Sequence, residues 1–179
     1  MGKRLLIIGA GGHGKVVKEI AVSLMENGSP VYTTVDFLDD NSEEAIGKVC
    51  ALETIKDSYD EVFCGIGNNH VRKKLIEQAE TKGCLIPALI HPTAYISPSA
   101  KIEKGTVIEP KAIVNANSTV KKGSIISVGA IIDHDVCVEE FVHVNAGAIC
   151  KAGSVIHALE KLEAGQVVLG YGAIGNRIW

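Results

Sequence analysis

Residues 108–132 read IEPKAIVNANSTVKKGSIISVGAII, and an aliphatic side chain occupies every sixth position of this stretch. The spacing continues in both directions without a slip, through Ile90, Ile96, Ile102, Ile108, Val114, Val120, Ile126, Ile132, Val138, Val144, Cys150, Ile156, Leu162, Val168 and Ile174. Two residues before these positions runs a second ladder that is small for most of its length: Ala88, Ala94, Ala100, Thr106, Ala112, Ser118, Ser124 and Ala130. A helix of period 3.6 cannot keep a six-residue ladder on one face, and a lone strand alternates by two without preferring six. A β-solenoid can keep such a ladder, because each hexapeptide forms one flat side of a coil with its branched residue inside. The sequence therefore predicts a β-solenoid.

The composition argues against several classes of function. Of the 179 residues, 46% are hydrophobic and 22% are charged, with a formal net charge of −3, which gives no electrostatic footprint for nucleic acid or an anionic membrane. No apolar run approaches membrane-spanning length, and residues 1–4 lead directly into a short apolar strand rather than forming a secretory signal. The five cysteines are odd in number and lack paired metal-ligand spacing. We therefore expect reduced thiols in a cytoplasmic protein and no metal site.

The first 89 residues have the pattern of a small α/β domain. Apolar runs predict strands at 4–8, 31–37, 61–65 and 85–90, with a helix after the first strand and another over 69–82, capped by Asn69. This alternation predicts a parallel, Rossmann-like sheet. The predicted organisation is thus a Rossmann-like domain over residues 1–89, followed by the solenoid over residues 90–179.

The glycines between the first strand and its helix point to a phosphate site. Gly9, Gly11 and Gly14 match the dinucleotide pattern G-x-G-x-x-G, in which backbone N–H groups approach phosphate oxygens at a helix N-terminus. Asp36 lies about where a ribose-binding acid is expected, so a nicotinamide-dependent enzyme is one hypothesis. The α/β part is too short for two mononucleotide halves, and a nucleotide sugar fits its size better. A tight turn that binds nothing is the structural alternative.

Several motifs together resemble one family. They are Ile7-Ile8-Gly9-Ala10-Gly11-Gly12-His13-Gly14-Lys15-Val16-Val17, Phe37-Leu38-Asp39-Asp40-Asn41, Gly65-Ile66-Gly67-Asn68-Asn69 with Arg72, Leu89-Ile90-His91-Pro92-Thr93-Ala94, and Ile132-Asp133-His134-Asp135. The chain resembles the sialic-acid O-acetyltransferase and bacillosamine N-acetyltransferase group of left-handed β-helix acyltransferases. The resemblance implies a left-handed coil, an N-terminal domain that holds a nucleotide sugar, and a homotrimer that binds acetyl-CoA between neighbouring subunits.

The resemblance also assigns roles to individual residues. His134 matches the family's general base, and Asp135 matches the acidic neighbour that raises its basicity. His143 matches a position that contacts acetyl-CoA, and stabilising a trimer seam is its alternative role. The residues expected at the nucleotide sugar are Gly11, Gly12, His13, Asp39, Asp40 and Gly67, although Asp and Asn also serve in turns and caps without any ligand.

The end of the ladder departs from the pattern. The small companion position is taken by Glu160 and Gln166, which are too large and polar for a narrow interior. We therefore expect a bulge or short helix over 159–163 and accidental sixfold spacing beyond it. Because members of the family usually continue the solenoid further, the chain is also expected to have a shortened C-terminal end, which affects the acetyl-CoA contacts more than the base.

The leading functional hypothesis is an acetyl-CoA-dependent acetyltransferase that acts on the amine of a nucleotide-linked sugar. O-acetylation of a sialic acid is the nearest alternative, because an amine and a hydroxyl need the same base. A non-catalytic sugar-nucleotide-binding or scaffold protein, which has lost its acyl-donor site, is the second alternative. The nicotinamide enzyme ranks third.

Overall fold

The computed structural model describes residues 2–171, and the chain divides into two compact units, Met1–Pro92 and Thr93–Trp179. Ile174, the last position of the predicted ladder, lies outside the described residues, as does the end of the predicted second domain.

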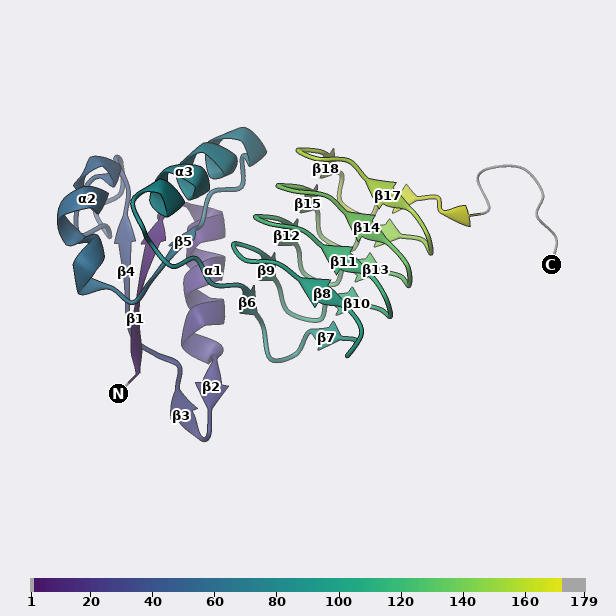
Figure 1. Cartoon of the computed structure of the whole chain (residues 1–179), viewed down its shortest axis with the longest axis horizontal. Helices are drawn as coiled ribbons and strands as arrows, with labels where there is room; N and C mark the ends of the chain where they lie inside the picture. The colour runs from purple at the N-terminus through teal and green to yellow at the C-terminus, as the bar shows by residue number, and fades with distance from the viewer. Residues whose placement is uncertain (1, 172–179) are drawn as a thin grey trace. The chain divides into compact units, whose positions relative to one another are not determined.

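The first unit is built on a three-stranded parallel sheet with strand order β4-β1-β5 (Figure 1). Its strands are β1 (Lys3–Ile8), β4 (Tyr32–Leu38) and β5 (Glu61–Cys64). Its helical segments are α1 (Gly12–Ser23), η1 (Val49–Ala51), α2 (Leu52–Ile55), η2 (Lys56–Ser58) and α3 (Asn69–Thr81). A two-stranded antiparallel ribbon, β2 (Met25–Glu26) with β3 (Ser29–Pro30), follows α1. The predicted Rossmann-like fold of this part is confirmed.

The central strand β1 is buried on both faces, which is why its sequence is a continuous apolar run. Leu6 and Ile8 belong to a core cluster with Leu52 of α2 and Ala79 of α3. Leu5 and Ile7 alternate with them and point to the opposite face. There α1 contacts the sheet, with Val17 and Ile20 fully buried.

Two predicted boundaries in this unit are wrong. Asn68, not Asn69, caps α3, because its Oδ1 accepts a hydrogen bond from the backbone N–H of Val71 at 3.1 Å. The predicted strand over 85–90 is reduced to β6 (Leu89–Ile90), and β6 is not part of the three-stranded sheet. The segment before β6 makes one backbone hydrogen bond with β5, from the N–H of Val62 to the carbonyl of Leu85 at 2.9 Å.

The remainder of the described chain is a left-handed parallel β-helix made of two-residue strands, as predicted (Figure 1). Its strands stack in three sheets, with orders β19-β16-β13-β10-β7, β17-β14-β11-β8 and β18-β15-β12-β9-β6. The bounds in the first sheet are β7 (Tyr95–Ile96), β10 (Ile113–Val114), β13 (Ile131–Ile132), β16 (Ile149–Cys150) and β19 (Val167–Val168). Those in the second are β8 (Lys101–Ile102), β11 (Thr119–Val120), β14 (Cys137–Val138) and β17 (Val155–Ile156). In the third sheet, β6 is followed by β9 (Val107–Ile108), β12 (Ile125–Ile126), β15 (His143–Val144) and β18 (Lys161–Leu162).

Each coil takes eighteen residues, so that residue i pairs with residue i+18, as Ile113 does with Ile131. The second residue of each strand belongs to the aliphatic ladder, and from Ile108 to Leu162 every ladder position is buried. A sharp corner follows each flat side. From residue 105 to residue 165, one residue at each corner has a positive φ, and these residues recur every six positions: Gly105, Lys111, Asn117, Gly123, Gly129, Asp135, Phe141, Gly147, Gly153, Leu159 and Gly165.

The expected irregularity over 159–163 is wrong. Strands β18 and β19 continue the sheets in register, and Leu162 is 0% exposed. Glu160 and Gln166 do not fill the interior. Their side chains turn back and accept hydrogen bonds from the backbone N–H groups of His157 and Glu163, three residues earlier, at 3.1 and 2.8 Å. Both side chains are exposed, so their size and polarity do not disturb the coil.

The buried position of Leu162 yields a direct test of this regularity. We expect Leu162→Ala to lower the free energy of unfolding by about 2–5 kcal/mol, because it removes buried methyl groups and leaves a cavity. Lys161→Ala, in the same strand but with an exposed side chain, should change it by less than about 0.5 kcal/mol. Urea denaturation followed by circular dichroism measures both, and equal effects would contradict an ordered coil at this position.

Candidate active site

Three glycines hold the turn between β1 and α1 against the end of β5. A Cβ atom on Gly14 would lie 2.0 Å from the carbonyl oxygen of Gly9, and one on Gly65 would lie 2.7 Å from the Cα of Gly14. Gly9 also has a φ of 103°, which side chains rarely permit. Gly9, Gly14 and Gly65 are therefore required by close backbone packing, whether or not a ligand binds.

Three other glycines face open space. A Cβ atom on Gly11, Gly12 or Gly67 would meet no atom within 4 Å. Gly11 is the N-cap of α1 and provides no side-chain cap, and the first turn of the helix carries no acidic residue. The first N–H groups of this twelve-residue helix therefore form a favourable environment for an anion. His13 lies in the same first turn and is partly buried.

The two aspartates after β4 brace the neighbouring loops. The Oδ2 atom of Asp39 accepts a hydrogen bond from the N–H of Ala10 at 2.8 Å, and its Oδ1 atom accepts one from Asn41 at 2.8 Å. These backbone donors lower the pKa of Asp39. Asp40 accepts a hydrogen bond from the N–H of Val49 at 3.0 Å. A carboxylate has about four acceptor positions, so these bonds leave capacity for a ligand.

Asp36 does not occupy the position of a ribose-binding acid. It lies inside β4, and its Oδ2 atom accepts a hydrogen bond from the hydroxyl of Tyr59 at 2.6 Å. Burial, together with this hydrogen bond, raises the pKa of Tyr59 to about 12. The guanidinium of Arg4 lies 4.9 Å from the centre of the Tyr59 ring. Asp36 thus serves the packing of the sheet, and it gives no support to a nicotinamide site.

Arg72 was named from the sequence only as part of the motif at residues 65–69, with no role assigned, although it organises the loop after β5. Its side chain is 1% exposed, and its guanidinium donates to the carbonyls of Ile66 and Gly67 at 3.1 Å each. It also donates to Oδ1 of Asn69 at 2.8 Å. Burial lowers its pKa to about 10. A signal for this role existed, because Arg72 shares the buried helical face of α3 with Asn69, Ile76 and Ala79.

A groove of about 1130 Å³ lies between α3 and the segment that follows β4. Four lysines line it, Lys48, Lys73, Lys74 and Lys82, together with the carboxylates of Asp40 and Glu77. One of the four, Lys82, forms an ion pair with Glu53, so the lysines exceed the nearby carboxylates by one. His70 and Asn41 also line it. This charge balance favours an anionic ligand.

In the β-helix, the corner after β13 carries the second group of predicted site residues. The Nδ1 atom of His134 lies 2.8 Å from Oδ2 of Asp135, and the two side chains are 52% and 40% exposed. The main chain of His134 is fixed on both sides. Its N–H donates to Oδ1 of Asp133 at 2.8 Å, and its carbonyl accepts from the N–H of Gly153 at 3.1 Å. Because a carboxylate only accepts, the neutral imidazole carries its proton on Nδ1, which leaves the lone pair of Nε2 available to a substrate.

The charges at this corner make His134 a stronger base. The hydrogen bond that His134 donates to Asp135 is the largest cause of the raised pKa of His134, and the negative charges of Asp133 and Asp135 add to it. In turn, the pKa of Asp135 is lowered by its hydrogen bonds with His134 and Asn117. The predicted pairing of an imidazole with an adjacent carboxylate is therefore present in the structure.

His143 lies on a different side of the coil. It belongs to β15, whereas the His134 corner follows β13 and precedes β14. The Nε2 atom of His143 lies 3.2 Å from the Oγ atom of Ser127, one coil earlier. Within one chain, the structure therefore does not bring His143 and His134 together.

Comparisons with known proteins agree with this geometry. Residues 4–79 match the model of the PglD N-terminal domain family. The acetyltransferase domain of PglB from Neisseria gonorrhoeae FA1090 is 36% identical in sequence, and the match covers 93% of this chain and 82% of that chain with a TM-score of 0.87. The chain belongs to the bacillosamine-type N-acetyltransferase family. The family predicted from the sequence is thereby confirmed.

Three further matches carry informative names. The same PglB domain has a structure in complex with acetyl coenzyme A, with a TM-score of 0.86. A variant of perosamine N-acetyltransferase from Caulobacter crescentus, in complex with CoA and GDP-perosamine, is 27% identical over 93% of this chain and 89% of that chain, with a TM-score of 0.82. UDP-N-acetylbacillosamine N-acetyltransferase of Bacillus subtilis (strain 168) is 32% identical over 109 residues, which span 59% of this chain and only 50% of that protein.

Between residues 2 and 171, no three His, Cys, Asp or Glu side chains gather in a way that could hold a metal ion. Over the same range, every helix is too short or too polar to span a lipid bilayer. The five cysteines are all free.

The two classes of glycine in the α1 turn can be separated by substitution. We expect Gly14→Ala to destabilise the protein by about 3 kcal/mol or more, because its Cβ would overlap backbone that cannot move aside independently. Gly12→Ala enters open space at the start of a helix and should leave stability unchanged or slightly higher. Thermal unfolding of both variants measures this difference. An equal loss of stability would show that Gly12 is also required by packing.

Proposed function

We propose that this protein transfers an acetyl group from acetyl-CoA to the amine of a nucleotide-linked sugar. The observation that carries the proposal is the 2.8 Å contact between His134 and Asp135 at an exposed corner of a rigid coil. Family membership supports the reaction class. The names of the relatives, an N-acetyltransferase of UDP-N-acetylbacillosamine and one in complex with CoA and GDP-perosamine, support the choice of donor and acceptor.

We further propose that the first unit holds the nucleotide. The unobstructed glycines Gly11, Gly12 and Gly67 would let phosphate oxygens approach backbone N–H groups at the start of α1. His13 in the same turn would donate to the diphosphate, and Asp39 and Asp40 would accept hydrogen bonds from the nucleoside. The lysine-lined groove beside Asp40 supports an anionic ligand in this unit.

The transfer needs no covalent intermediate on the protein. The neutral amine attacks the thioester carbonyl carbon, and Nε2 of His134 takes the proton that the nitrogen loses. The tetrahedral intermediate then collapses, the carbon–sulfur bond breaks, and the imidazolium returns its proton to the departing thiolate to give free CoA. Asp135 stays ionised throughout and stabilises the imidazolium. Positioned general-base catalysis of this kind is worth about 10²- to 10⁴-fold.

We propose a homotrimer as the working assembly. The sheet that contains β13 presents an outward row of apolar side chains, which are Tyr95, Ile113, Ile131, Ile149 and Val167. Tyr95 and Val167 are largely exposed in the single chain, and packing against another copy would cover them. The placement of His143 also supports this assembly. If His143 contacts the acetyl-CoA used by His134, the two must come from neighbouring copies. The free cysteines are in keeping with a cytoplasmic location.

Two alternatives are weaker. O-acetylation of a sialic acid would use the same base, but the relatives from Bacillus subtilis and Caulobacter crescentus carry the names of N-acetyltransferases. A sugar-nucleotide-binding scaffold without an acyl-donor site was suggested by the expected shortening of the solenoid. It is the weaker proposal, because the coil stays regular through β19 and the relatives from Neisseria gonorrhoeae and Caulobacter crescentus have structures in complex with acetyl coenzyme A or CoA.

The general base is tested by His134→Ala. We expect this variant to lose at least 100-fold in the rate of CoA release when acetyl-CoA is supplied with a panel of nucleotide amino sugars and free sialic acid. Light scattering should give three times the 18.9 kDa chain mass for wild type and variant alike, which controls for assembly. Undiminished turnover in the variant would rule out His134 as the base. Failure of wild-type protein to bind acetyl-CoA in calorimetry, with a nucleotide sugar still bound, would favour the scaffold instead.

The carboxylate beside the base should show in the pH dependence of kcat/KM. His134 must be neutral to accept a proton, and its raised pKa places the acidic limb of the profile above the usual value of about 6.5. In Asp135→Asn, loss of the charge should lower the pKa of His134, so the limb moves to lower pH while the plateau rate falls. The charge of Asp133, which also raises the pKa of His134, is retained in this variant and limits the downward shift of that pKa. A limb that stays in place would mean that Asp135 does not act on the titrating group.

A further inference from the structure

The residues with positive φ form three columns along the coil, because corners eighteen residues apart lie above one another. In two columns these residues are mostly glycine, together with Lys111, Phe141 and Leu159. The third column contains Asn117, Asp135 and Gly153. Asparagine and aspartate are the residues other than glycine that most readily adopt this conformation. This third column lies next to the candidate base, because Asp135 directly follows His134. In it, the polar side chains of Asn117 and Asp135 project from equivalent positions in successive coils.

The geometry links these side chains in a chain of contacts. The Nδ2 atom of Asn117 donates to Oδ1 of Asp135 at 3.2 Å, and the other oxygen of Asp135 lies 2.8 Å from Nδ1 of His134. Both carboxylate oxygens of Asp135 thus accept a hydrogen bond, one from Asn117 and one from His134. Asn117 is itself held, because its N–H donates to Oγ of Ser99 at 3.1 Å and its φ is 59°.

A neighbouring pair performs a different task. Asn115 donates to Oδ1 of Asp133 at 3.3 Å, and the same oxygen accepts the N–H of His134. That pair fixes the main chain of His134 and does not touch its ring. The orientation of the ring depends on Asp135, and the orientation of Asp135 depends on Asn117.

We propose that Asn117 is a positioning residue, which holds the Asp135 carboxylate so that His134 keeps its proton on Nδ1 and presents Nε2 to the substrate. The inference rests on the proposed function, in which His134 is the base. Asp135 is 40% exposed, so little packing restrains its side chain, and the amide of Asn117 supplies the missing restraint. Without the amide of Asn117, the carboxylate of Asp135 rotates away from His134 for part of the time, and the imidazole proton then moves to Nε2. Molecules in that state cannot accept a proton from the amine.

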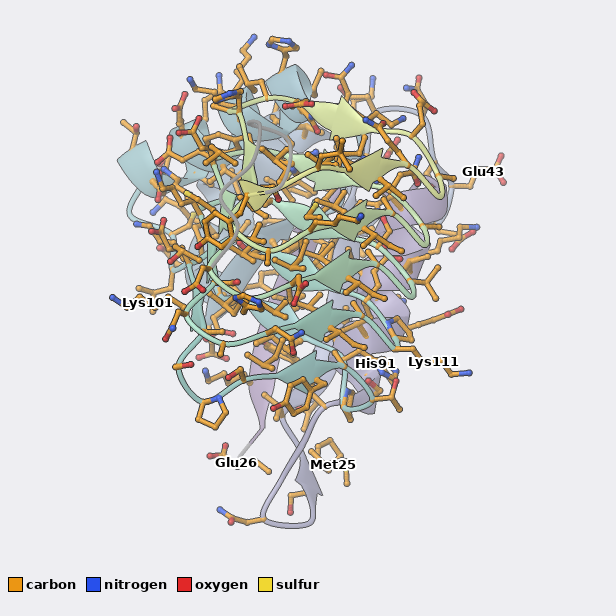
Figure 2. The ribbon with its side chains drawn as sticks, turned by 90° about the vertical axis from the view of Figure 1, so that its right-hand side faces the viewer. Met25, Glu26, Glu43, His91, Lys101 and Lys111 are labelled. Atoms are coloured by element: carbon orange, nitrogen blue, oxygen red, sulfur yellow. The ribbon has the colours of Figure 1, made fainter. Side chains whose placement is uncertain are left out.

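The test uses two substitutions at position 117 and one control. Asn117→Gly keeps the positive φ and removes the amide. Asn117→Asp keeps the shape and replaces the donor with a charge that repels Asp135. The control is Lys111→Gly, which places glycine at the equivalent corner position of another column, where φ is also 59°. Figure 2 shows the side chain of Lys111 pointing away from the coils.

The first measurement is the tautomer of His134 by nitrogen-15 NMR, at a pH where the ring is neutral, with His134→Ala used to assign its resonances. Wild type and Lys111→Gly should show the proton on Nδ1, whereas Asn117→Gly should show a mixture with Nε2. The second measurement is steady-state kinetics. We expect kcat to fall about tenfold in Asn117→Gly, the scale for losing an outer partner of a functional histidine, with both KM values unchanged. Asn117→Asp should fall further.

Each outcome decides the matter. An unchanged tautomer in Asn117→Gly overturns the proposal, even if kcat falls, because the loss would then be merely structural. A changed tautomer with kcat within twofold of wild type overturns the link to catalysis. If Asn117→Gly fails to fold, the same two criteria apply to Asn117→Asp. Failure of the proposed function is distinguishable, because it would appear as turnover retained in His134→Ala, whatever the tautomer in the position-117 variants.

Discussion

The pairing of each strand with the strand eighteen residues later is the constraint on which the β-helix and its His134 corner depend. Parallel hydrogen bonds lock this register, as between Ile131 and Ile149. Every sixth side chain then points into the coil, and every corner is stacked on another. At one corner this repetition brings an asparagine, an aspartate and a histidine into contact without any loop or insertion. The rigidity of the candidate base is thus a property of the coil rather than of a separate scaffold.

In the N-terminal unit, close packing of backbone against backbone, rather than strand register, fixes the turn that carries the predicted binding residues. Its phosphate-type turn is shaped by backbone that approaches backbone, since Gly9, Gly14 and Gly65 leave no space for a side chain. Asp39 and Arg72 then secure the two loops that flank the turn, one through its carboxylate and the other through a buried guanidinium. With packing carried by these residues, Gly11, Gly12 and Gly67 remain unobstructed. Glycines that look alike in the sequence therefore have two different roles.

The sequence was sufficient for the fold class and the family, because each rests on local patterns, and it predicted the contact between His134 and Asp135 that the structure shows. The aliphatic spacing specifies the coil, and Asp135 follows His134 directly in the chain. Features that depend on side-chain direction were harder to predict. Glu160 was judged by size and polarity as interior filling, but it bonds to its own turn and lies outside. The partner of Asp36, Tyr59, is 23 residues away and could not be inferred from spacing. The contact of Asn117 with Asp135 could have been predicted, because a coil has three sides of six residues and these two residues are therefore one coil apart.

The eighteen-residue register makes the length of the solenoid discrete. Deleting or duplicating a whole coil returns every remaining residue to an equivalent environment, whereas inserting a single residue turns the aliphatic row of a strand outward. Evolution can therefore add or remove coils on either side of the His134 corner without moving its chemistry. In such a fold, the number of coils can change without a change in the side chains at this corner. Relatives with different numbers of coils can share one corner.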